Sequence, residues 1–114
     1  MPKVAAYTTL RKEPLTLAAN GNHSFTFNAP DVNGTSNSEL LFVLAPEVNA
    51  HLTMTLNAVV IYTNVKFGMT TWRSLNVTVD DGIVLPAGNT LTVTNNGTDS
   101  LDMSDVIMFY EVNV

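Results

Sequence analysis

The sequence contains no cysteine, and this absence excludes several kinds of site at once. Without cysteine the chain has no disulfide framework, no thiolate nucleophile and no cysteine-ligated zinc or iron–sulfur centre. Its two histidines, His23 and His51, are too few for a three-histidine catalytic metal site. Only 13% of the residues are charged, and ten Asp and Glu outnumber five Lys and Arg. Because nucleic-acid binding requires clustered positive charge, we expect no nucleic-acid partner.

Long apolar runs are also missing. No apolar segment approaches the roughly 20 residues needed to span a bilayer, so we expect no membrane partner. Residues 1–14 lack the apolar stretch of a secretory signal, which leaves cytoplasmic synthesis and removal of a leader as alternatives for the unknown compartment. A chain of 114 residues can bury roughly 65% of its unfolded surface, and we expect residues 1–114 to form one domain.

Threonine, valine and asparagine are abundant, with 15, 14 and 13 copies, whereas glutamine is absent. Polar and apolar residues alternate with period two in segments 51–57, 59–67, 74–79 and 90–94, which is typical of half-buried strands. In the second of these, Tyr62 would face away from the core. Turn residues separate the segments and leave no room for a long helix. The pattern predicts an all-β fold, a two-sheet antiparallel β-sandwich (jelly roll) with seven to nine strands.

Two further expectations concern strand placement. Segments Leu40–Ala45 and Val106–Tyr110 are apolar on both faces, which predicts central strands covered on both sides. Near the amino terminus, the alternation predicts a hairpin with a three-residue loop at 20–22, in which Leu17 pairs with Phe25 and Leu15 with Phe27.

Four motifs follow one another in residues 52–112. They are Leu56-Asn57-Ala58 before residues 59–62, then Trp72-Arg73-Ser74-Leu75-Asn76-Val77, then Leu85-Pro86-Ala87-Gly88-Asn89-Thr90-Leu91, and then Ser104-Asp105-Val106-Ile107. In this order they resemble the galactose-binding-like jelly-roll domains found in carbohydrate-binding modules, except that Ala58 stands where that family commonly has glycine. The resemblance implies a carbohydrate partner and, as in many such modules, a structural calcium.

Sugar binding needs neutral hydrogen-bonding groups for the hydroxyls and an aromatic face for the ring. Trp72, the single tryptophan, shares the polar face of its predicted strand with Asn76, opposite Arg73. The candidate ligand-binding residues are Trp72, Asn57, Asn76, Asp80, Asp81 and Tyr62. Two plainer alternatives stay open: Trp72 as a core residue, and Asp80-Asp81-Gly82 as an ordinary hairpin turn.

Oxygen-bearing side chains are frequent in residues 95–102, and calcium prefers six to eight oxygen ligands. Asp99, Asp102 and Asp105 are therefore candidate calcium ligands. The segment does not match EF-hand spacing, and acidic turn residues are the alternative. We expect no other cofactor.

Two functions fit these features. The first is a non-catalytic, lectin-like carbohydrate-binding module; we expect no enzyme, because the four glutamates are scattered and no G-x-S-x-G motif occurs. The second is a structural, self-assembling subunit, such as a capsid decoration or a fibre or particle component, that associates through Thr/Asn-rich sheet faces. Low surface charge favours a homo-oligomer in either case.

Overall fold

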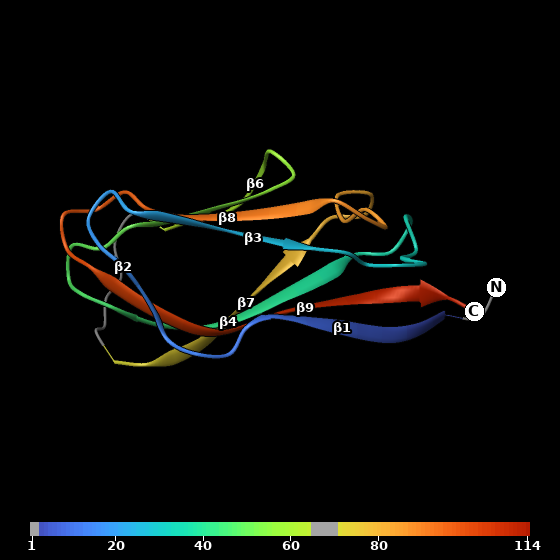
Figure 1. Ribbon diagram of the computed structural model, residues 1–114, viewed down its shortest axis with the longest axis horizontal. Helices are drawn as coiled ribbons and strands as arrows, with labels where there is room; N and C mark the ends of the chain where they lie inside the picture. Colours follow the sequence, from blue (N-terminus) through green and yellow to red (C-terminus); the bar gives the residue numbers. More distant parts are fainter. Residues whose placement is uncertain (1–2, 65–70) are drawn as a thin grey trace.

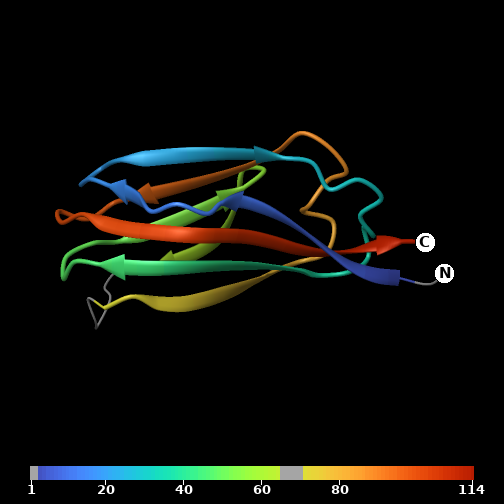
Figure 2. The same cartoon turned by 60° about the horizontal axis from the view of Figure 1, so that its bottom comes forward.

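The computed structural model describes residues 3–64 and 71–114, which form nine strands in two antiparallel sheets. Sheet A has the order β1-β9-β4-β7, with the short β2 also paired to β9, and sheet B has the order β3-β8-β5-β6. Figure 1 shows the sheets stacked as two layers, and Figure 2 shows β9 between β1 and β4. The strands are β1 (Lys3–Arg11), β2 (Leu15–Leu17), β3 (Asn22–Phe27), β4 (Ser38–Pro46), β5 (Leu52–Leu56), β6 (Val59–Asn64), β7 (Arg73–Val79), β8 (Asn89–Asn95) and β9 (Leu101–Asn113).

The predicted two-sheet antiparallel β-sandwich is therefore confirmed. Period-two alternation directs one side of each sheet into a shared core, where Leu40, Phe42 and Leu44 of β4 face Leu52 and Leu56 of β5, all fully buried. Burial of each such side chain contributes about 1.5–3 kcal/mol. The residues described contain no helix at all, and hence none suited to crossing a membrane.

The length of β9 sets the long dimension of the molecule. Its 13 residues extend about 43 Å at roughly 3.3 Å per residue, close to the 47 Å overall length. Because β1 and β9 are antiparallel, Lys3 pairs with Asn113 and both lie at one end of the sandwich. This end also holds the start of β4 and the end of β7, since Ser38 pairs with Val79.

The strands β4 and β9 are central in sheet A, as their two-sided apolar sequences predicted. The prediction that they are covered on both sides is wrong for the outer face. Leu41, Val43 and Ile107 are only half-buried there, and Phe109 is 38% exposed. The outer face of sheet A is thus apolar along its middle and accessible to solvent.

The predicted amino-terminal hairpin is also wrong. Leu15 and Leu17 lie in β2, which pairs with β9 in sheet A, whereas Phe25 and Phe27 lie in β3, which pairs with β8 in sheet B. The intervening residues carry the chain from one sheet to the other. The alternation suggested a hairpin because all four side chains do point into the same core. They reach it from two opposite sheets and not from two neighbouring strands of one sheet.

A β-bulge in β6 reverses the predicted direction of Tyr62. Ile61 is an extra residue between Val60 and Tyr62, the partners of consecutive residues in β5. A one-residue insertion exchanges the two faces of a strand. The Tyr62 ring consequently packs edge-on against Phe42 of sheet A, with centroids 5.7 Å apart and planes at 76°. The end of that predicted strand, residues 65–67, lies outside the described residues.

A fully buried asparagine, Asn95, stabilises the carboxyl-terminal end of β8. Asn95 donates from Nδ2 to the carbonyl oxygens of Leu17 at 3.1 Å and Asp99 at 2.7 Å. Its Oδ1 accepts the backbone N–H groups of His51 at 3.2 Å and Gly97 at 3.0 Å. A single amide therefore joins the start of β5, the end of β2 and the turn between β8 and β9.

Candidate functional site

A row of paired residues crosses all four main strands on the outer face of sheet A. Tyr7 of β1 pairs with Phe109 of β9, Phe109 pairs with Glu39 of β4, and Glu39 pairs with Thr78 of β7. Paired residues in neighbouring strands project from the same face. With strands about 4.8 Å apart, the row is about 14 Å wide. It brings two aromatic rings together on β1 and β9 and places a carboxylate on the next strand.

Tyr7 and Phe109, which we name the aromatic pair, present ring surface to solvent. Tyr7 is 66% exposed and Phe109 is 38% exposed. Their ring centroids are 5.9 Å apart and their planes are tilted by 40°. Alternation along β9 explains the direction of Phe109, because its neighbours Met108 and Tyr110 are buried in the core. An accessible aromatic surface of this kind is suited to contact with a ligand.

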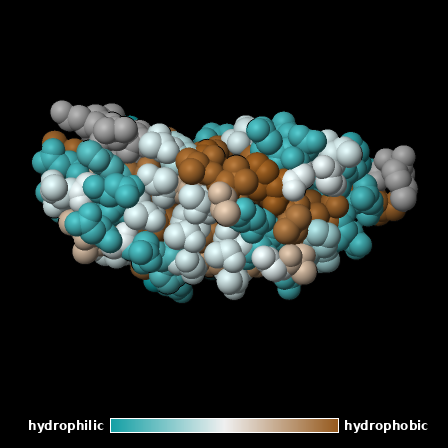
Figure 3. Space-filling model, turned by 90° about the horizontal axis from the view of Figure 1, so that it is seen from above, coloured by the Kyte–Doolittle hydropathy of each residue, from teal (hydrophilic) through white to brown (hydrophobic). Residues whose placement is uncertain are grey.

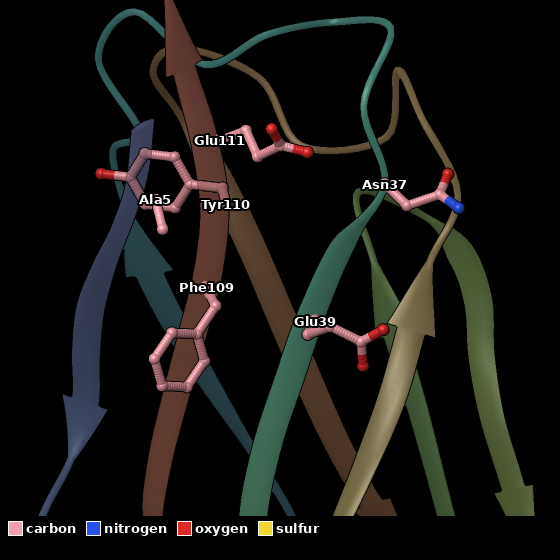
Figure 4. A pocket seen from close by; sticks show the side chains of 6 residues that line it. All are labelled: Ala5, Asn37, Glu39, Phe109, Tyr110 and Glu111. Carbon is pink, nitrogen blue, oxygen red and sulfur yellow. The ribbon is translucent and has the colours of Figure 1, made fainter. Parts of the chain in front are cut away.

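A hollow of about 210 Å³ adjoins the aromatic pair at the end of the sandwich where the termini meet. Its lining, drawn in Figure 4, consists of Ala5, Asn37, Glu39, Phe109, Tyr110 and Glu111. Ala5 is the partner of Glu111 in the β1–β9 ladder. The small side chain of Ala5 leaves room beside Glu111 that a larger residue would fill.

The polar groups of the hollow are held by β7 and the loop after it. Thr78 donates from Oγ1 to Oε1 of Glu39 at 2.6 Å, and Asn76 donates from Nδ2 to Oε2 at 3.2 Å. Asn37 accepts the backbone N–H of Asp81 on its Oδ1 at 3.0 Å. These bonds fix the Glu39 carboxylate and orient the Asn37 amide, so both present defined hydrogen-bonding geometry to a ligand.

Several residues expected at a ligand site lie close to this hollow. Asn76 contacts Glu39 through its side chain, and Asp81 contacts Asn37 through its backbone. Asp80 precedes Asp81 and is exposed. Trp72 is 49% exposed, as a surface position requires, but it lies six residues from Thr78, about 20 Å away along the strand direction. The hollow and Trp72 therefore belong to opposite ends of the same sheet.

Asn57 and Tyr62, also candidates from the sequence, do not lie at the hollow. Tyr62 is turned inward by the bulge in β6. Asn57 serves the turn between β5 and β6, where it and Ala58 have φ values of 51° and 69°. Its Nδ2 donates to the Ile83 carbonyl at 2.8 Å, and its Oδ1 accepts the N–H of Thr90 at 2.9 Å. The Asn57 amide thus ties the turn to the start of β8.

The three candidate calcium ligands have separate structural contacts. Asp99 accepts the N–H of Asn49 at 3.0 Å, and Asp102 accepts the Thr16 hydroxyl at 2.6 Å. Asp105 is the exposed residue at a bulge in β9, with φ of 51°. Within residues 3–64 and 71–114, no group of three or more His, Asp or Glu side chains could hold a metal ion. Calcium binding through these three aspartates stays a prediction from the sequence.

Sequence reasoning missed the aromatic pair and its polar neighbours, namely Tyr7, Phe109, Glu39, Glu111 and Asn37. Tyr7 and Phe109 are 102 residues apart in the sequence, and the β1–β9 pairing joins them. The alternation in the last strand was a usable indication, because a strand that buries Met108 and Tyr110 must direct Phe109 outward. The prediction that this strand is covered on both sides left the outward direction of Phe109 unrecognised.

The outer face of sheet B has a different character. Threonines of β5 and β8 occupy it in register, for example Thr53 opposite Thr94 and Thr55 opposite Thr92. Figure 3, which views the molecule from this side, shows pale and hydrophilic surface with apolar areas over its middle and toward one end. Val60 of β6 is among the exposed apolar residues. This face has threonine hydroxyls where the outer face of sheet A has aromatic rings and carboxylates.

Comparison with known proteins identifies the fold. No family model matches the chain, and no curated protein matches it by sequence. Solved structures do match. Dimeric latent PorU from Porphyromonas gingivalis aligns with a TM-score of 0.77 and 11% identity over 99% of this chain, which spans only 13% of the PorU chain.

Two carbohydrate-binding modules align over nearly their whole length. The C-terminal CBM6 of LamC, a marine laminarinase from Zobellia galactanivorans, has a TM-score of 0.58 and 13% identity, covering 96% of this chain and 99% of that one. CBM29_1, a family 29 module from Piromyces equi, has a TM-score of 0.60 and 9% identity, covering 96% and 91%. The predicted likeness to a carbohydrate-binding-module jelly roll is thereby confirmed at the level of the fold.

Proposed function

We propose that this chain binds carbohydrate on the outer face of sheet A, centred on the aromatic pair and the hollow beside it. The observation that carries the proposal is the exposed aromatic pair next to the hydrogen-bonded carboxylate of Glu39. A sugar ring has C–H groups on its faces and hydroxyls at its edge. Tyr7 and Phe109 would contact the ring faces, Glu39 would accept hydrogen bonds from the hydroxyls, and Asn37 would both donate to the hydroxyls and accept from them.

The fold adds support of a weaker kind. The CBM6 of LamC and CBM29_1 share this architecture over nearly their full length. Because one fold hosts many functions, the proposal depends on the chemistry of the site and not on the likeness alone. The site provides both parts that sugar recognition needs, an apolar ring surface and directed polar groups.

We propose binding without catalysis. Glycoside hydrolysis requires two carboxylates on either side of the scissile bond, commonly within a cleft. Glu39 and Glu111 instead project from neighbouring strands of one exposed sheet face, and two neutral donors hold Glu39. Incubation with the oligosaccharides that bind should release no shorter products.

The proposal is tested by calorimetric titration with short neutral oligosaccharides, namely cello-, xylo- and mannotriose. The variants Tyr7→Ala and Phe109→Ala should each weaken binding at least about tenfold, which corresponds to roughly 1.4 kcal/mol. Both side chains are partly or largely exposed, so the variants should stay folded. Circular dichroism provides the check on folding.

Two matched variants serve as controls. Val60→Ala removes an exposed apolar side chain from β6 of sheet B, and Trp72→Ala removes the aromatic residue at the far end of sheet A. Neither should change the affinity for a trisaccharide. If Trp72→Ala abolishes binding while Tyr7→Ala does not, the site lies at Trp72, as the sequence alone suggested. Absence of binding to every sugar would refute the proposed function.

The self-assembly alternative makes a contrasting prediction. It requires a large particle or fibre in light scattering, dispersed by Thr55→Lys and Thr92→Lys on the outer face of sheet B. The carbohydrate proposal expects these two variants to retain sugar affinity, because both threonines lie on the sheet opposite the aromatic pair.

A further inference from the structure

Acidic side chains gather at the end of the sandwich that holds the hollow. Glu39 and Glu111 line it, Asp81 bonds to Asn37 at its edge, and Asp80 precedes Asp81. Arg11, at the end of β1, lies at the end of the sandwich away from the hollow, and so does Arg73, at the start of β7. Lys12, which follows β1, lies there too. The chain carries a net charge of −5, and this end concentrates its negative part beside the proposed sugar site.

The aromatic pair lies directly beside these carboxylates. Phe109 is the register partner of Glu39, so their side chains are neighbours on one face, about 5 Å apart at Cβ. Glu111 follows Phe109 by two residues along β9 and projects from the same face, about 7 Å from Phe109 along the strand. Thr78 and Asn76 hold the Glu39 carboxylate toward β7, and Figure 4 shows it directed away from the Phe109 ring. An ammonium group in the hollow would therefore meet the carboxylates of Glu39 and Glu111 through charge-assisted hydrogen bonds, while the sugar ring lies on the aromatic pair.

Within residues 3–64 and 71–114, Lys3 is the basic residue at this end, and it leaves the two carboxylates available. Lys3 begins β1 at the same end, and its Nζ donates to the Ser36 hydroxyl at 3.3 Å. Glu39 is held by the uncharged donors of Asn76 and Thr78. Uncharged donors orient the carboxylate without neutralising it, so its charge still attracts a cation.

A divalent metal fits the hollow less well than an organic cation does. Calcium takes six to eight oxygens, and in the part of the chain that the structure describes no three acidic side chains group closely enough to hold a metal. An amine needs only one or two carboxylates.

Building on the proposed function, we infer that the hollow selects a glycan that carries a free amine, such as a β-1,4-linked glucosamine chain. The sugar rings lie on the aromatic pair, and the protonated amine enters the hollow between Glu39 and Glu111. The inference extends the proposed site by naming the class of sugar that it prefers.

Three trisaccharides that differ only at carbon 2 test the inference: chitosan trimer with a free amine, its N-acetylated form, and cellotriose with a hydroxyl. Titrations are done at mildly acidic pH, where the amine is protonated, and at low ionic strength. The free amine should bind about tenfold or more tightly than the other two, a gain expected from one charge-assisted contact. High salt should reduce this advantage, since exposed charges are screened.

Variants locate the effect. Glu111→Gln keeps the shape of the side chain and should remove most of the amine preference while leaving cellotriose affinity nearly unchanged. Glu39→Gln should weaken the binding of cellotriose as well, because Glu39 accepts hydrogen bonds from sugar hydroxyls, but it should weaken the binding of the free amine more. Asp105→Asn, at an exposed bulge outside the hollow, removes the same charge and should leave the preference intact.

The possible failures are distinguishable. Equal affinity for all three sugars would overturn the amine inference and leave the proposed carbohydrate function standing. No binding to any sugar would overturn both. If trilysine binds as tightly as the glucosamine trimer, the surface attracts any cation and the inference of a selective amino-sugar site is wrong.

Discussion

Replacement of Asn95 by alanine should be among the most damaging single substitutions in this chain. The Asn95 side chain is fully buried and joins three segments, accepting from the N–H groups of His51 and Gly97 and donating to the carbonyls of Leu17 and Asp99. The substitution removes the hydrogen-bond partner of these four backbone groups. A buried polar group that loses its partner costs about 1–3 kcal/mol.

Water entering the vacated space would satisfy some of these groups. If two of the four stay unsatisfied, the cost is about 2–6 kcal/mol, against a total stability of about 6–17 kcal/mol for a chain of this size. At roughly 4 °C per kcal/mol, the melting temperature should fall by about 8–24 °C. Urea unfolding monitored by circular dichroism measures the same loss, as a lower midpoint with an unchanged slope.

The adjacent residue is a matched control. Asn96 is exposed, and its Oδ1 accepts one hydrogen bond, from the hydroxyl of Thr53 at 2.7 Å. Asn96→Ala should therefore cost less than about 1 kcal/mol. If Asn95→Ala proves no more destabilising than Asn96→Ala, the buried amide does not organise this end of the sandwich and the reasoning is refuted.

Three further substitutions test other parts of the fold by urea unfolding. Ala58→Gly should stabilise the protein by about 0.5–1 kcal/mol, because Ala58 has φ of 69°, where a side chain is strained and glycine is not; destabilisation would contradict this. Gly97→Ala should cost about 3 kcal/mol or more, since a Cβ there would meet the Asn49 carbonyl oxygen and lie 2.7 Å from the His51 nitrogen; a neutral effect would mean that the turn is looser than described. Trp72→Ala should cost less than about 1.5 kcal/mol, because half of that side chain is exposed, whereas a loss of 3–5 kcal/mol would place it in the core.

Period-two alternation was sufficient to predict the sandwich, because it records which side of each strand faces the core. It does not record which strand lies beside which. Leu17 and Phe25 alternate correctly with their neighbours, yet they lie in different sheets. The hairpin prediction failed because the same pattern results whether two strands pair in one layer or face each other across two.

The site was partly predictable for a related reason. The polar face of β7 was identified from the sequence, and Asn76 on that face does contact Glu39. The aromatic pair was not, since pairing of the first and last strands leaves no local trace in either. Tyr62 was misplaced by a single inserted residue, which alternation cannot reveal when the preceding side chains, Val59 to Ile61, are all apolar.

The central claim is that carbohydrate binds at the aromatic pair on the outer face of sheet A. Amide chemical-shift mapping with ¹⁵N-labelled protein and a trisaccharide that binds tests it most directly. The account predicts the largest shifts at Tyr7, Glu39, Phe109 and Glu111, with little change at Thr92 on the opposite sheet. Shifts concentrated on the threonine face of sheet B, or around Trp72 alone, would contradict it.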